Sequence, residues 1–270
     1  MIVDFHTHIF PDKIATATVA ALERRGGSPA HSDGTADGLL ASLHTAGVDV
    51  GVNLPVLTKP GQFDSILEFS KGINATDFKN ERIISFAGIH PLDEDFEAHL
   101  QAVRDAGILG IKIHPDYQGT FFDDERYVRI ISEAKRLGLI VVTHAGLDIG
   151  FRGEEIRCTP TRVLRLLDRI GGYSRLVLAH LGGADLTREV IDNLAGEDVY
   201  FDTAYVLGVV ERAELTEVIE KHGADRILFA TDSPWQNIKC EVARLDSLGL
   251  SDAERRMILS ENAKRLLGIK

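Results

Sequence analysis

The chain has 270 residues, of which 44% are hydrophobic and 26% charged, which suits one domain with a large core. Its formal net charge of -11 argues against a nucleic-acid surface, because phosphate binding needs clustered lysine and arginine. Two cysteines are too few for a disulfide framework, no secretion-type segment opens the chain, and no apolar run reaches the ~20 residues of a membrane span. We expect a cytoplasmic domain over residues 1–270 that takes a small-molecule substrate. Assembly into a homo-oligomer is left open.

Eight apolar runs predict strands buried on both faces, the kind found in parallel sheets. The amphipathic stretches between them predict helices. The strands are expected at 2–5, 48–54, 83–89, 109–113, 140–143, 176–179, 199–201 and 227–231, and helices at 12–25, 124–137, 160–170, 211–222 and 237–248. Strands that alternate with helices along a whole chain predict an α/β fold with a parallel sheet. Eight such units close into a (β/α)8 TIM barrel with its active site at the C-terminal strand ends. An open, doubly wound sheet is the main alternative.

Two segments depart from this alternation. Residues 10–37 contain a helix, then glycine, serine and proline and a polar loop. We interpret them as an insertion after the first strand, either a lid over the site or an excursion that does not contact substrate. A C-terminal helix over 251–267 starts with Ser251 and has Glu254 three residues later, the pattern of a capping box.

A His-x-His pair, His6 and His8, ends the first predicted strand. Residues two apart on a strand point to one face, so the two imidazoles can converge on a metal ion. The pattern is short, and two exposed histidines are the ordinary alternative. Four later strands also end in metal-competent or ionisable residues, namely Lys112 with His114, His144, His180 and Asp232. An open sheet gives no reason for this repetition, so we favour a barrel with a metal site.

The same segments resemble the amidohydrolase superfamily. The resemblance spans the chain and rests on His6-Thr7-His8, His144-Ala145-Gly146, His180-Leu181-Gly182-Gly183, Asp232-Ser233-Pro234-Trp235 and Glu261-Asn262-Ala263. The chain is similar to the amidohydrolase 2 group, metal-dependent hydrolases and decarboxylases that include aminocarboxymuconate-semialdehyde decarboxylase. The resemblance implies a hydrolase that uses a metal-activated water on a small organic substrate such as a lactone or an amide. A non-oxidative decarboxylase of the same family and a metal-binding barrel without turnover are the alternatives.

The resemblance also implies a ligand set. One divalent metal, for which Zn²⁺ suits a shell of imidazole and carboxylate, would be bound by His6, His8, His144 and Asp232. Asp232 would also handle a proton, and His180 would act as a catalytic base or electrophile. Relatives with two metals carry a carboxylated lysine, so Lys112 and His180 would become ligands if the centre were of that kind.

Four residues are candidates for substrate binding. An unmodified Lys112 would hold a substrate carboxylate, with a purely structural role as the alternative. His114 shares its face and either contacts the substrate or supports a neighbouring residue. Arg152 and Arg157 lie on the loop after the fifth strand and either clamp a carboxylate or belong to a surface charge cluster. These cations and the metal predict an anionic substrate that carries a carboxylate.

The remaining polar residues of interest give less specific signals. His90 ends the third predicted strand and either lines the pocket or is structural. Asp202 ends the seventh and either orients a site residue or simply terminates its strand. His44, His99 and His222 lie in helical stretches away from the strand ends, and we expect them to face solvent.

Overall fold

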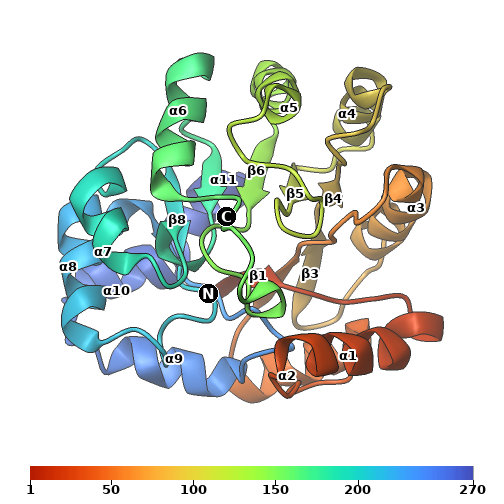
Figure 1. The fold of residues 1–270 in the computed structure, drawn as a ribbon. Helices are drawn as coiled ribbons and strands as arrows, with labels where there is room; N and C mark the ends of the chain where they lie inside the picture. The colour runs from red at the N-terminus through yellow and green to blue at the C-terminus, as the bar shows by residue number, and fades with distance from the viewer. Residues whose placement is uncertain (270) are drawn as a thin grey trace.

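The strands are parallel and surround a common axis, with the helices outside them (Figure 1). The computed structural model describes residues 1–269. One sheet orders β1 (Val3–Thr7), β2 (Val50–Asn53) and β3 (Arg82–Ser85); the other orders β4 (Ala87–Gly88), β5 (Gly110–Ile113), β6 (Ile140–Thr143), β7 (Leu176–Leu178), β8 (Tyr200–Asp202) and β9 (Ile227–Leu228).

The two sheets close into one barrel. Only Phe86 separates β3 from β4, so together they take the place of the third predicted strand. On the other side, Phe5 N donates to Phe229 O at 2.9 Å, and Asp232 N donates to His6 O at 2.9 Å. These bonds join β1 to the chain around β9. The predicted eight-position TIM barrel is therefore confirmed, with its third strand interrupted.

The helices follow the strands around the barrel and begin and end at recognisable signals. Asp124 accepts a hydrogen bond from Arg126 N at the start of α5, and Thr159 accepts one from Arg162 N at the start of α6. The predicted capping box of Ser251 is also present. No helix of residues 1–269 is both long and apolar enough to cross a bilayer. The helices are α1 (Asp12–Gly26), α2 (Ala36–Ala46), α3 (Phe63–Asn74), α4 (Phe96–Asp105), α5 (Glu125–Leu137), α6 (Pro160–Ile170), α7 (Thr187–Glu189), α8 (Arg212–His222), α9 (Ile238–Asp246), α10 (Asp252–Arg256) and α11 (Asn262–Leu267).

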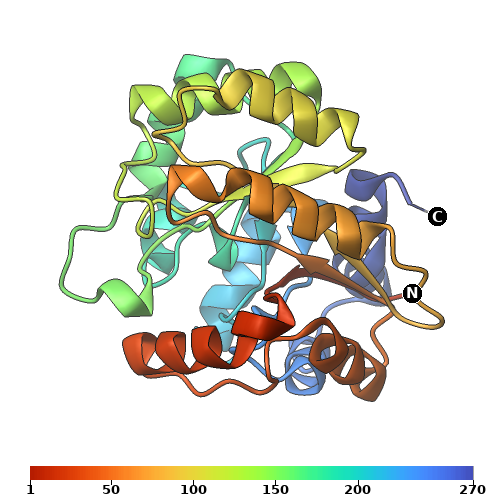
Figure 2. The same ribbon diagram turned by 90° about the vertical axis from the view of Figure 1, so that its right-hand side faces the viewer.

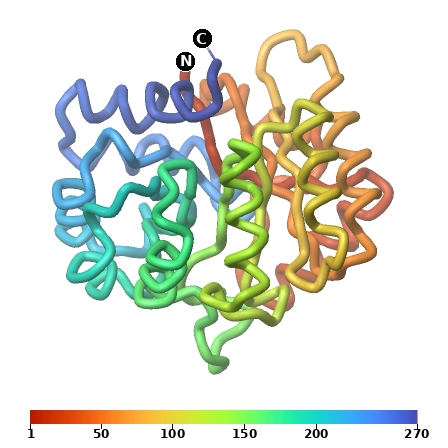
Figure 3. Tube along the Cα trace, turned by 90° about the horizontal axis from the view of Figure 1, so that it is seen from above, coloured from red at the N-terminus to blue at the C-terminus, as the bar shows by residue number. Residues whose placement is uncertain are grey.

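The apolar core has an inner and an outer part. The inner cluster takes residues from β1, β2 and β6 to β9, and among the helices of residues 1–269 only α11 contributes to it. The largest outer cluster joins the opposite faces of the strands to the surrounding helices. Figure 3 shows α11 near the two termini, whereas the loop after β6 projects from the other end of the barrel. That other end carries the C-terminal strand ends.

A bulge in β1 decides which side chains enter the barrel. Asp4 pairs with Gly51, but Thr7 pairs with Asn53, so the register shifts between them. Phe5 belongs to the inner apolar cluster, and the next residue, His6, also points inward, where it contacts Lys112. Consecutive residues of a regular strand point to opposite faces, so the bulge is what lets both face inward.

The expectation that His222 faces solvent is wrong. The side chain is 1% exposed and stacks on Phe201, with the ring centroids 3.8 Å apart. Its Nδ1 accepts from Gly196 N and its Nε2 donates to Val199 O, both at 3.1 Å. His44 is exposed as expected, and His99 is half-buried against Phe63. The sequence indicated only that His222 lies in a helix. In the structure one face of α8 is buried, and His222 lies on that face.

His222 should make stability depend on pH. Burial, with the nearby Arg226, lowers the pKa of His222 from 6.5 to about 4. Between these values the unfolded chain binds a proton that the folded chain does not, so stability falls as pH falls from 6.5 to 4. We expect His222→Gln to destabilise the protein at pH 7, and the difference from wild type to shrink by about 3 kcal/mol by pH 4. Urea unfolding of both proteins across this range measures it; a constant difference would contradict the assignment.

Candidate metal centre

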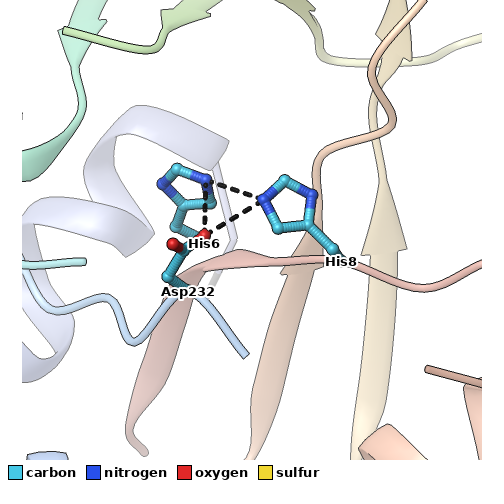
Figure 4. A group of neighbouring side chains, drawn as sticks. All are labelled: His6, His8 and Asp232. Carbon is cyan, nitrogen blue, oxygen red and sulfur yellow. Dashed lines mark hydrogen bonds and ion pairs between the residues drawn. The ribbon is translucent and has the colours of Figure 1, made fainter. Parts of the chain in front are cut away.

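Three of the four predicted metal ligands meet at the C-terminal end of the barrel. His6 lies on β1, His8 follows that strand, and Asp232 follows β9. His6 Nε2 and His8 Nε2 are 3.1 Å apart, and Asp232 Oδ1 lies 3.4 Å from the first nitrogen and 3.1 Å from the second (Figure 4). All three atoms thus face one point.

Both imidazoles are held with the same nitrogen toward this point. His6 Nδ1 lies 2.8 Å from Asp202 Oδ2, and His8 Nδ1 lies 2.9 Å from the carbonyl oxygen of Leu54. Each partner accepts, so each Nδ1 carries the hydrogen and each Nε2 presents a lone pair. Burial, followed by the charge of Lys112, lowers the pKa of His6 well below its usual value. His6 is therefore neutral, as a metal ligand must be.

The three residues fit a divalent metal. Two lone pairs and a carboxylate oxygen that face one another are mutually repulsive without a cation between them. Metal–ligand bonds of about 2.0–2.2 Å place ligand atoms roughly 3–3.5 Å apart, and the three separations here fall in that range. The pKa of Asp232 is lowered even though burial opposes the shift, so its carboxyl group is ionised at neutral pH. Ionised Asp232 is the form that could bind a divalent cation.

Lys112 lies beside this centre. The side chain is 1% exposed, and its Nζ is 3.2 Å from His6 Nε2. Burial lowers its pKa to about 8 against the opposing charges of Asp202 and Asp232. An ammonium here would repel a divalent cation unless an anion lay between them, and either a substrate carboxylate or the carbamate of a carboxylated lysine would supply the negative charge. Substrate binding, carboxylation and a structural role of Lys112 all stay predictions.

The fourth predicted ligand, His144, belongs to a neighbouring group. Its ring stacks on that of His114, with centroids 4.2 Å apart, and a metal-competent cluster is formed by His114, His144 and Asp148. His144 Nδ1 is 3.0 Å from His180 Nε2, and His180 Nδ1 is 2.8 Å from Ala204 O. His180 thus sits beside His144, with its ring centroid 5.5 Å from that of His6. A ligand role for His144 in the first centre stays a prediction.

The two predicted arginines lie farther out on the loop after β6. Arg152 is exposed. Arg157 donates to Asp116 Oδ1 at 3.3 Å and to Glu154 Oε2 at 3.0 Å. Its guanidinium is therefore already paired, and a substrate carboxylate would have to compete with these carboxylates. Substrate binding by either arginine stays a prediction.

The insertion after β1 reaches the same loop. Arg25, near the end of α1, lies over the ring of Phe151 at 4.0 Å and donates from Nε to Gly150 O at 3.2 Å. Tyr117 packs edge-on against both Phe151 and His114. Figure 2 shows α1 alongside the loop after β6. Of the two interpretations of residues 10–37, this placement at the active-site end favours the lid.

Backbone strain marks the site. His180, Leu181 and Asp232 have φ values of 57°, 52° and 66°, a region that costs a side chain roughly 1–2 kcal/mol. Gly146, two residues after His144, has φ 84°, and a Cβ there would come within 2.1 Å of Ala184 N. These turns aim the side chains that follow the strands toward the barrel axis, and surrounding contacts must hold them.

Three carboxylates at the site went unnoticed in the sequence. Asp4 joins β1 to the chain after β9 by accepting from Thr231 N, and burial raises the pKa of Asp4 to about 7. Burial and the charge of Asp148 raise the pKa of Asp116 to about 6. The Asp-x-His-x-His spacing was a signal for Asp4. Asp116 and Asp148 lie in loops, where spacing implies no fixed geometry.

A parallel (β/α)8 barrel with two histidines and an aspartate facing one point at its C-terminal strand ends defines the class of metal-dependent TIM-barrel enzymes. The sequence profile of the amidohydrolase family (amidohydrolase 2) matches residues 3–269, and the chain belongs to that family. The predicted resemblance is thereby confirmed. A search of curated protein sequences gave no significant match.

Several solved structures are similar over nearly the whole chain. One is 2,6-dihydroxybenzoate decarboxylase from Rhizobium, with 19% identity, 99% of this chain and 98% of that chain covered, and a TM-score of 0.67. Another is 5-carboxyvanillate decarboxylase from Sphingomonas paucimobilis, with 17% identity, coverages of 100% and 99%, and a TM-score of 0.69. A third is a dihydroxybenzoic acid decarboxylase from Polaromonas with bound manganese and 2-nitroresorcinol, at 16% identity, coverages of 99% and 96%, and a TM-score of 0.73. At these identities the likeness supports the fold.

Proposed function

We propose that the protein is a metal-dependent, non-oxidative decarboxylase of a small aromatic carboxylate. The observation that carries the proposal is the triad of His6, His8 and Asp232, whose lone pairs face one point beside the buried amine of Lys112. The sequence favoured a hydrolase, but the three similar structures described above are decarboxylases, so we now favour the alternative. The non-catalytic barrel has no observation in its favour, because the triad is complete.

The reaction exchanges a carboxylate for a proton: the bond between ring and carboxylate carbon breaks, carbon dioxide leaves, and the ring carbon gains a hydrogen. When bound, the metal would supply positive charge that holds the oxygen donors of the substrate. Lys112 would bind the carboxylate through Nζ. Asp232 Oδ1 faces His6 and His8, whereas Oδ2 has no hydrogen bond among residues 1–269, so Oδ2 is the atom we assign to carry the proton. His180 Nε2 would assist.

The metal is a divalent cation, for which the sequence predicted zinc. Imidazole nitrogen and carboxylate oxygen are ligands that both Zn²⁺ and Mn²⁺ accept. The Polaromonas structure contains manganese. We therefore propose that either ion supports activity and that metal-free protein has none.

A substrate panel tests the proposal. Metal-depleted protein is loaded with Zn²⁺ or Mn²⁺ and assayed with 2,6-dihydroxybenzoate, 5-carboxyvanillate and related benzoates, together with neutral lactones and amides. Release of carbon dioxide from at least one benzoate, dependent on the metal, is the expected result. Turnover of the lactones or amides alone would instead indicate that the protein is a hydrolase.

Lys112→Met should weaken substrate binding. Loss of a buried charged partner costs about 2 kcal/mol or more, so KM for the anionic substrate should rise roughly 30-fold. Metal content should stay at the wild-type level, because the change removes a cation. Lys71→Met, which alters an exposed lysine on α3, is the matched control. An unchanged KM in steady-state assays would leave Lys112 with a structural role.

A further inference from the structure

Asp202, the last residue of β8, connects two parts of the site. The side chain is fully buried. Its Oδ2 accepts from His6 Nδ1 at 2.8 Å. Its Oδ1 accepts from His180 N at 2.9 Å and from Ala204 N at 3.1 Å. One carboxylate therefore contacts a triad imidazole through one oxygen and the strained turn at His180 through the other.

We propose that Asp202 is a positioning residue that fixes the tautomer of His6 and anchors the turn that carries His180. A carboxylate only accepts hydrogen bonds, so it places the His6 proton on Nδ1 and leaves a lone pair on Nε2. Partners of this kind typically improve metal affinity 10–100-fold. The proposal rests on the metal centre of the proposed function, but not on the reaction catalysed there.

The arrangement of donors makes asparagine an informative replacement. Two backbone N–H groups point at the position of Oδ1, so the amide oxygen of Asp202→Asn must stay there. The amide nitrogen then faces His6 Nδ1. Because NH2 only donates, His6 Nδ1 would have to accept, and the imidazole proton would move to Nε2. The turn at His180 would keep its anchor, while the metal-facing lone pair of His6 would be lost.

Two measurements on the full chain test this. In metal-free protein, ¹⁵N NMR reports which ring nitrogen of His6 is protonated, with the signals assigned by their loss in His6→Gln. Calorimetric titration with Zn²⁺ or Mn²⁺ then gives the dissociation constant. We expect the Nδ1–H form in wild type, the Nε2–H form in Asp202→Asn, and a dissociation constant 10–100-fold higher in the variant.

A matched control separates this effect from a general loss of stability. Asp93 Oδ2 accepts from His99 Nδ1 at 2.7 Å, a similar pair between the loop after β4 and α4 that contains no triad residue. Asp93→Asn should leave metal affinity unchanged. Equal losses in both variants, or an unchanged His6 tautomer and affinity in Asp202→Asn, would overturn the proposal. If Asp202→Asn does not fold, the wild type still tests the proposal. An Nε2–H form of His6 in the metal-free wild type would overturn it.

The outcomes also separate this proposal from the proposed function. The protein could bind metal as expected and show the shifted His6 tautomer in Asp202→Asn, yet release no carbon dioxide from any benzoate. That result would support the role of Asp202 and refute the decarboxylase. Metal-dependent decarboxylation together with an unshifted tautomer would support the decarboxylase and refute the role of Asp202.

Discussion

Replacing both His6 and His8 by alanine is expected to give a folded protein that binds no metal at the triad and has almost no activity. The change removes two of the three proposed triad ligands, and the remaining carboxylate of Asp232 should not hold a divalent ion at micromolar concentrations. If the ion contributes about 5 kcal/mol to the transition state, kcat/KM should fall roughly 10⁴-fold. Elemental analysis of the purified variant and steady-state assays measure the two effects.

The control for this variant is His44→Ala, because His44 is exposed on α2 and pairs with Glu81. It should match wild type in metal content and rate. Circular dichroism and thermal unfolding establish that the double variant is folded, since His6 is buried and its loss leaves a cavity. A double variant that retains a full metal equivalent would place the metal elsewhere, with the group of His114, His144 and Asp148 as the next candidate.

His180→Asn is expected to slow turnover with little loss of metal. Asparagine tolerates the φ of 57° at this position, so the turn should survive. The lost imidazole is the group proposed to assist Asp232 in proton transfer, and general acid–base catalysis typically contributes ~10²–10⁴-fold to kcat. Pre-steady-state and steady-state assays at saturating metal give kcat, and elemental analysis gives the metal content. Loss of a second metal equivalent in the variant would instead show that His180 is a ligand of a two-metal centre.

The placement of the site was predictable because parallel strands bring their C-terminal ends together. Polar residues after apolar runs therefore had to meet, and His6, His8 and Asp232 do, although 224 positions separate His8 from Asp232. The bulge in β1 was not predictable, since alternation alone would have put Phe5 and His6 on opposite faces. The interruption of the third strand at Phe86 was not predictable either, because a continuous apolar run does not show where the hydrogen bonding between strands is interrupted.

Other misses arise from contacts between distant segments. His222 looked like a solvent-facing helical residue because its partners, Gly196 and Val199, lie on another part of the chain. In the sequence, Asp202 was equally compatible with a residue that simply terminates a strand. Only the structure shows that its carboxylate contacts His6. Hydrolysis and decarboxylation use the same donors on a metal, so the ligand pattern alone does not distinguish them; the similar structures shifted the preference.

The most direct test of the proposed reaction follows isotopes from solvent into product. Metal-loaded protein converts a hydroxybenzoate in D₂O, and separately in H₂¹⁸O, and the product is analysed by mass spectrometry. A decarboxylase replaces the carboxylate by one deuterium at the same ring carbon and puts no ¹⁸O into the ring product. An unconverted hydroxybenzoate, together with cleavage of a lactone or amide whose product gains ¹⁸O from solvent, would contradict decarboxylation and identify a hydrolase.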